Sequence, residues 1–140
     1  MPVHRIRLLG PWEFLWKGSA GEGAPLVTEG TTAMPCDWRS LFGLVVGTAT
    51  FRRRFHCPSN LEPHERVWLI GTGVRGCGTV SLNDEQLSEF NSDGEAVECE
   101  MTSRLQPFNV VSIQLSAGSI EEDQPPGGLF DPVVLEIRGD

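Results

Sequence analysis

The clearest pattern in the sequence is the alternation of apolar and polar residues along Thr48–His56. Phe51, Arg53 and Phe55 share one side of an extended chain, and the threonine, arginines and histidine between and beside them share the other. Because successive side chains of a strand point to opposite faces, this segment is predicted to be a strand with an aromatic inner face and a basic outer face. Arg53 is the charged residue on that inner face.

The same two-residue period recurs in several other short segments. Val67 and Leu69 share one face and Trp68 and Ile70 the other, and glycines then interrupt the run before a strand that ends at an Asn83-Asp84 turn. Further strands are predicted at Trp12–Trp16, Thr79–Leu82, Ala96–Met101, Phe108–Leu115 and Pro132–Ile137. The closing strand is expected to pair with an early one.

Short strands without any helix of three turns predict an all-β fold, an antiparallel β-sandwich of jelly-roll type. The segments Gly18–Thr32 and Gly118–Gly128 are rich in glycine and polar residues and are expected to be irregular surface loops. The 140 residues are enough to bury one full core, so residues 1–140 are expected to form a single domain.

The composition of the chain disfavours some classes of binding partner. Nineteen acidic and eleven basic residues give a formal charge of −8, which disfavours binding to nucleic acid or to an anionic membrane surface. The N-terminal segment has no apolar run of secretory length, and no segment approaches the roughly 20 apolar residues of a membrane span. A cytoplasmic location is therefore expected.

The four cysteines, Cys36, Cys57, Cys77 and Cys99, show neither a CxxC motif nor a spacing with histidine that suits zinc. Three of them lie in or beside apolar segments, which favours reduced and mostly buried thiols over one or two disulfides. No spaced aspartate or asparagine motif marks a calcium site. The sequence therefore predicts no metal site and no cofactor.

Several motifs, in order along the chain, resemble one known domain. They are Leu9–Phe14 (LGPWEF), Met34–Trp38 (MPCDW), Phe51–Phe55 (FRRRF), Val67–Val74 (VWLIGTGV), Val80–Asn83 (VSLN), Asn109–Leu115 (NVVSIQL) and Gly128–Leu135 (GLFDPVVL). Together they are similar to the N-terminal sugar-binding domain of glycoside hydrolase family 2, a jelly roll of the galactose-binding type. Two turns depart from the family pattern, with Asp84 in place of a glycine and Gln106–Phe108 in place of a Gly-x-Asn segment.

The resemblance implies a domain without catalytic activity. A glycosidase needs two carboxylates that flank the scissile bond on a rigid scaffold, and in this family they come from a separate (β/α)8 barrel. The acidic clusters of this chain, such as Glu98 and Glu100, are more typical of a solvated surface. The three histidines accompany no nucleophile motif of hydrolase type. We therefore expect no enzymatic activity.

Sugar binding needs a flat aromatic face beside polar groups that meet the hydroxyls. Trp12 and Trp38 are expected to pack in the core, whereas Trp16 and Trp68 are interpreted as lying off the core face and are the candidate platforms. Arg53, Asn83 and Asp84 are the candidate polar contacts, and this set completes the predicted ligand site. Arg53 must either pair with an acid or reach a rim of the sandwich, and Asn83-Asp84 is also explained as a plain turn.

Two functions remain open at this stage. The first is a non-catalytic carbohydrate-binding module. The alternative is a domain that has lost sugar binding and contacts a protein partner or a second copy of itself. An open groove that combines an aromatic face with polar groups would favour the first, and its absence would favour the second.

Overall fold

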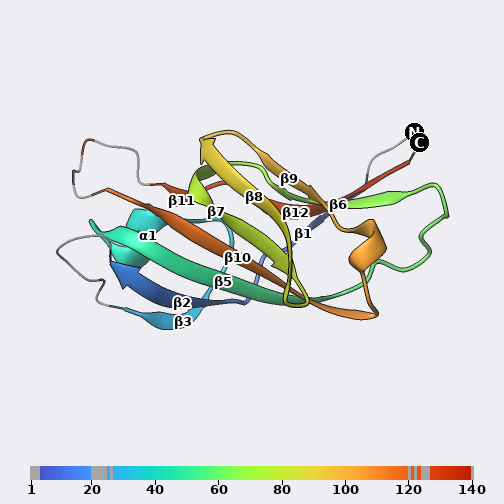
Figure 1. Ribbon diagram of the computed structural model, residues 1–140, viewed down its shortest axis with the longest axis horizontal. Helices are drawn as coiled ribbons and strands as arrows, with labels where there is room; N and C mark the ends of the chain where they lie inside the picture. Colours follow the sequence, from blue (N-terminus) through green and yellow to red (C-terminus); the bar gives the residue numbers. More distant parts are fainter. Residues whose placement is uncertain are drawn as a thin grey trace.

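The computed structural model describes residues 4–19, 25, 27–119, 121, 123 and 127–139. The fold is an antiparallel β-sandwich of two packed sheets, in which strands β5 and β10 run along most of the length of the molecule (Figure 1). The predicted all-β, jelly-roll-like class is confirmed. Helical structure in the described residues is limited to α1 (Trp38–Phe42) and a 3₁₀ turn at Thr102–Arg104.

The smaller sheet has four strands in the order β1, β12, β6 and β9. Their bounds are His4–Arg7, Val133–Arg138, Arg66–Gly71 and Val97–Glu100. All three pairs are antiparallel, and β12 lies between β1 and β6. The prediction that the closing strand pairs with an early one is confirmed.

The larger sheet has eight strands, in the order β3, β2, β5, β10, β7, β11 and β4, with β8 added beside β7. Their bounds, in that order, are Glu29–Thr32, Trp12–Ser19, Val46–His56, Phe108–Gly118, Val74–Leu82, Gly128–Leu129, Cys36–Asp37 and Glu85–Asp93. The central pair, β5 and β10, stays in register over the full length of both strands.

One apolar core fills the space between the sheets. Trp12 is fully buried and Trp38 is 1% exposed, which confirms the prediction that both are core residues. Each indole N–H donates to a main-chain carbonyl, that of Trp12 to Leu8 over 2.7 Å and that of Trp38 to Val45 over 3.0 Å. The buried polar end of each tryptophan is thereby satisfied, as a water-free position requires.

Several short strands lie where the sequence pattern did not predict them, and two of them, β3 and β8, are mostly polar. Strand β3 falls inside the segment that was expected to be a loop, and it pairs with β2 although none of its residues is apolar. Strand β8 follows the Asn83-Asp84 turn and is mostly polar and half-exposed. Strands held chiefly by main-chain pairing at a sheet edge carry a weak hydrophobic signal, which explains both omissions.

The four cysteines are free thiols, as favoured from the sequence, but their surroundings differ. Cys99 is buried and Cys77 is exposed on β7, so the expectation of mostly buried thiols holds only in part. Burial raises the pKa of the Cys99 and Cys36 thiols. No helix among the described residues has the length and apolar character needed to cross a bilayer.

Candidate functional site

The outer face of the eight-stranded sheet is polar because it carries the alternate residues of strands whose other face forms the core. A row of neighbouring residues runs across five strands on this face. The row consists of Thr31, Glu13, Arg52, Ser112 and Ser81. Such a row of hydroxyls and charged groups suits recognition of a polar ligand.

Strand β5 loses one neighbour near its end. Its pairing with β2 stops at Arg52 and Glu13, whereas its pairing with β10 continues to His56 and Phe108. No described strand pairs with the remaining edge of β5 after Arg52. This gap lets a side chain from the inner face reach the surface.

Arg53 occupies the gap. Its position between the buried Phe51 and Phe55 belongs to the inner face, yet the side chain is only half-buried. Its Nη1 donates to the carbonyl of Arg54 over 2.9 Å, so the guanidinium folds over the free edge of its own strand. Of the two outcomes expected from the sequence, Arg53 takes the second and lies at a rim.

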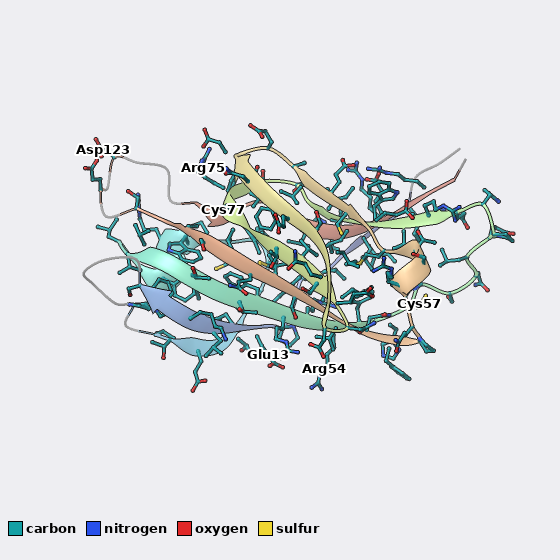
Figure 2. The ribbon with its side chains drawn as sticks, in the orientation of Figure 1. Glu13, Arg54, Cys57, Arg75, Cys77 and Asp123 are labelled. Atoms are coloured by element: carbon teal, nitrogen blue, oxygen red, sulfur yellow. The ribbon has the colours of Figure 1, made fainter. Side chains whose placement is uncertain are left out.

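At this rim lies a hollow of about 280 Å³. It is lined by Gly10, Pro11, Glu13, Thr31, Arg52, Arg53, Arg54 and Val110. Glu13 and Arg54 project from the same side of the molecule, from β2 and β5 respectively (Figure 2). The hollow therefore brings together side chains from the sheet face and from the gap beside β5.

An exposed aromatic residue stands next to this hollow. Phe108 is 70% exposed and meets the His56 ring edge-on, with ring centroids 4.9 Å apart. These two rings line a second hollow of about 460 Å³ together with Arg54, Phe55, Asn109 and Val110. Because Arg54 and Val110 line both hollows, the two are adjacent, and we call them together the β5 groove.

The groove extends in the other direction as well. A third hollow of about 510 Å³ shares Glu13, Thr31 and Arg52 with the first and continues toward Lys17 and Glu29. The three hollows follow the outer face of β5 and its neighbours. The depression is therefore long enough to accept an extended ligand as well as a single small one.

The arginines of the groove have few acidic partners. Arg52 lies 3.9 Å from the exposed carboxylate of Asp84, and no ion pair joins Arg53 or Arg54 to any described residue. The Nε atom of Arg53 is buried without a hydrogen-bond partner in the described part of the chain. Burial lowers the pKa of the Arg53 guanidinium, but an arginine remains cationic in proteins. The first hollow is thus positively charged, with Glu13 as its carboxylate.

The Asn83-Asp84 turn borders the groove, but its amide is already engaged. Asn83 Oδ1 accepts from the Val110 N–H over 2.8 Å, and its Nδ2 donates to Asn109 Oδ1 over 3.1 Å. Both turn residues have positive φ angles, 52° and 69°, which a hairpin turn of this kind requires. Asn83 therefore fixes the start of β10, where Phe108 is presented, while Asp84 extends toward Arg52.

Trp16 lies elsewhere than the sequence interpretation placed it. It shares the inner face with Trp12 and Phe14, because all three occupy alternate positions of one strand. Its ring packs 4.8 Å from that of Phe42 and 5.6 Å from that of Trp38. Trp16 is thus a half-buried member of the aromatic core and not an off-core residue.

Trp68 does lie off the core face, on the outer face of the four-stranded sheet. Its ring is covered by the Arg138 guanidinium at 4.6 Å from the centroid. Glu136 and Glu100 flank it on the neighbouring strands. Trp68 and Trp16 do not line the β5 groove, whereas Arg53 lines it. Asn83 and Asp84 do not line it but contact two residues that do, Val110 and Arg52.

Sequence reasoning missed Phe108, His56, Arg54 and Glu13 as members of one site. A signal for Phe108 was present, because Val111, Ile113 and Leu115 alternate inward and thereby place residue 108 on the opposite face. The pairing of β5 with β10 was not readable from the sequence. That pairing is what sets Phe108 beside His56 and next to Arg54.

The fold has counterparts among solved structures. The FMN-binding β-glucuronidase of Faecalibacterium prausnitzii L2-6 matches with a TM-score of 0.77 and 18% identity over 98% of this chain and 23% of its own. The β-glucuronidase of Bifidobacterium dentium gives 0.76 and 18%, over 98% and 30% of the two chains. A β-glycosidase of Bacteroides vulgatus gives 0.72 and 20%, over 97% and 20%.

These matches are matches of fold. The chain spans between a fifth and a third of the length of these three glycosidases. No family model and no curated protein matches the sequence. The resemblance expected from the motifs is therefore supported as a shared β-sandwich that forms one part of larger glycosidases.

Proposed function

We propose that this chain is a non-catalytic carbohydrate-binding module whose ligand lies in the β5 groove against Phe108. The observation that carries the proposal is the exposed Phe108 ring at the end of a groove lined with arginine, glutamate and threonine. A sugar ring presents an apolar C–H face to an aromatic ring and its hydroxyls to polar groups. The likeness in fold to part of several glycosidases supports a role in carbohydrate chemistry.

The groove favours binding over catalysis. Glycoside hydrolysis needs a pair of carboxyl groups held about 5–10 Å apart on a rigid scaffold. Glu13 is the carboxylate of the first hollow, and the other described carboxylate of the groove, Glu29, is exposed on the polar edge strand β3 in the third hollow. The chain should therefore not turn over chromogenic β-glucuronide, β-galactoside or β-mannoside substrates. Turnover that persists through repurification would contradict the non-catalytic part of the proposal.

Glycan-array screening followed by titration calorimetry tests the binding itself. We expect weak binding, with a dissociation constant of order 0.1–1 mM, because an open site exchanges water bonds for protein bonds at little net gain. Phe108→Ala should weaken it by about five- to tenfold, since stacking on one ring contributes about 1–1.5 kcal/mol.

Trp68→Ala is the matched control, because it removes an aromatic surface residue outside the groove. It should leave the affinity unchanged. Binding that depends on Trp68 and not on Phe108 would move the site to the four-stranded sheet. The absence of binding by any glycan at millimolar concentration would overturn the proposal.

One observation favours the alternative of a protein-contacting domain. Strand β1 is an edge strand in which all four residues are exposed, including Ile6 at 42%. An exposed edge with unpaired main-chain groups can add a strand from another chain. Sedimentation velocity of the purified protein tests this: a dimer that is lost on substitution of Ile6 by lysine would favour assembly through β1.

A further inference from the structure

The β5 groove differs in charge from the protein around it. The chain carries a formal charge of −8, yet Arg52, Arg53 and Arg54 line one hollow in which Glu13 is the acidic side chain. Several arginines outside the groove have close acidic partners: Arg104 lies 2.7 Å from Glu85. Arg75 and Arg138 lie about as close to their own partners, at 3.1 Å and 2.6 Å.

Arg53 is the least satisfied of these cations. Its Nε atom is buried without a partner among the described residues, and its Nη1 atom donates to the main-chain carbonyl of Arg54. Removing a guanidinium from water is unfavourable unless an anion or a set of acceptors replaces the lost hydration. No described side chain supplies the compensating anion, and an anion in the hollow can do so by lying against the part of the Arg53 side chain that lines it.

The two ends of the groove are close enough to serve one ligand. Phe108 lies opposite His56, and Arg54 is two residues before His56 on the same strand and the same face. Two residues of a strand span about 7 Å. A ligand of one or two sugar rings can therefore stack on Phe108 and place a charged substituent at the arginines.

On this basis, and resting on the proposed carbohydrate-binding function, we propose that the β5 groove binds an acidic saccharide. Its carboxylate or sulfate group lies between Arg53 and Arg54, and a ring of the same ligand lies against Phe108. Carboxylate and sulfate present similar planar or triangular sets of oxygens to a guanidinium, so the arginines accept either. Glu13 opposes the anion and limits its affinity while accepting hydrogen bonds from hydroxyls.

The experiment compares three ligands of equal length by titration calorimetry: an oligogalacturonate, a sulfated neutral oligosaccharide and its unsulfated parent. We expect at least one acidic ligand to bind tenfold or more tightly than the neutral one, with the difference shrinking as sodium chloride is raised. Binding of the carboxylated ligand alone or of the sulfated ligand alone would identify which group the site takes.

Substitutions of single charged residues test which side chains bind the anionic group. Arg54→Gln should weaken acidic binding at least fivefold more than it weakens neutral binding, and Glu13→Gln should strengthen acidic binding. Arg66→Gln is the control, because it removes an exposed arginine from the other sheet. The affinity of Arg53→Gln is interpreted only if thermal unfolding shows that this variant retains the fold. Arg54→Gln is therefore the variant that decides whether the arginines bind the anionic group.

The outcomes separate this inference from the proposed function. Equal affinity for neutral and acidic ligands would overturn the inference and leave carbohydrate binding intact. No binding by any of the three ligands would overturn both this inference and the proposed carbohydrate-binding function. An equal loss with Arg66→Gln, or displacement of the acidic ligand by inorganic sulfate at the same concentration, would show a general charge effect and would also overturn the inference.

Discussion

The outer face of the four-stranded sheet and the β5 groove on the other sheet both carry arginines, glutamates and an aromatic ring, but of these two regions only the four-stranded sheet has described groups that satisfy one another. On the four-stranded sheet, Glu136 is 5% exposed and accepts from Arg5 Nε over 2.8 Å and from Arg138 Nε over 2.6 Å. Arg138 also reaches Glu98 over 3.0 Å and covers the ring of Trp68. Every charged group in this cluster has a close partner, and the aromatic face is covered.

On the eight-stranded sheet the corresponding arginines and aromatic ring of the β5 groove are not covered in this way by other described side chains. Arg53 and Arg54 have no acidic partner in the described part of the chain, and Phe108 is bare apart from its edge contact with His56. The presence of arginine and an aromatic ring therefore does not identify a binding face. What distinguishes the two faces is whether the protein itself satisfies those groups.

The largest effect should come from the core that both faces share. Trp12→Ala removes a fully buried ring and its hydrogen bond to Leu8, and should lower the free energy of unfolding by about 3–5 kcal/mol. Leu15→Ala, on the exposed side of the same strand, is the control and should cost less than about 1 kcal/mol. Urea unfolding followed by tryptophan fluorescence measures both. Similar losses would mean that the core assignment of Trp12 is wrong.

An intermediate effect is expected from the paired face. Glu136→Gln should lower the free energy of unfolding by about 1–3 kcal/mol at neutral pH, because hydrogen bonds to a buried carboxylate are lost. The hydrogen bond from Arg138, followed by that from Arg5, holds the pKa of this carboxyl below its usual value. Its contribution is therefore fully present above the unfolded-state pKa and is lost as the pH falls through the folded-state pKa.

The difference between wild type and Glu136→Gln should accordingly be constant above about pH 5 and shrink below about pH 4. Chemical denaturation at a series of pH values measures it. Saccharide binding in the β5 groove should be unaffected at neutral pH, since Glu136 lies on the other sheet. A difference that grows on acidification would contradict the assigned pairing.

The smallest effect separates the two aromatic residues directly. Trp68→Ala should cost about 1–2 kcal/mol of stability, because it removes a half-buried ring and its contact with Arg138. Phe108→Ala should change stability by no more than about 0.5 kcal/mol, since its ring is mostly in water. Thermal and urea unfolding of the two variants are compared with wild type. A larger cost for Phe108→Ala would mean that its ring is structural.

Much of the fold could be predicted from the sequence, because the central strands show a clear alternation of inward and outward residues. In the predicted segments Thr48–His56 and Phe108–Leu115, the buried residues are the ones that the alternation selects. Strands β3 and β8 were not predicted because they are mostly polar and bury little of their surface at the sheet edges. Polar edge strands are visible only after the pairing is known.

The site was less accessible to sequence reasoning. Arg53 could be recognised as anomalous, but whether it met an acid or a rim depended on where β2 leaves β5. Trp16 was misplaced although its alternation with Trp12 and Phe14 was available. Phe108 was overlooked because its place in the site depends on its cross-strand neighbour His56. His56 lies 52 positions earlier in the chain, and the sequence did not reveal that the two strands pair.

The alternation along β5 also bears on how the ligand preference of the site proposed in the β5 groove could be changed. Arg54, His56 and Phe108 are exposed on the outer face of the sheet, so each can be exchanged without altering the residues that hold the sheets together. Arg53 is different, because its register belongs to the core face while its guanidinium lies in the groove. Ligand preference and folding are independently adjustable at the first three positions and are coupled at Arg53.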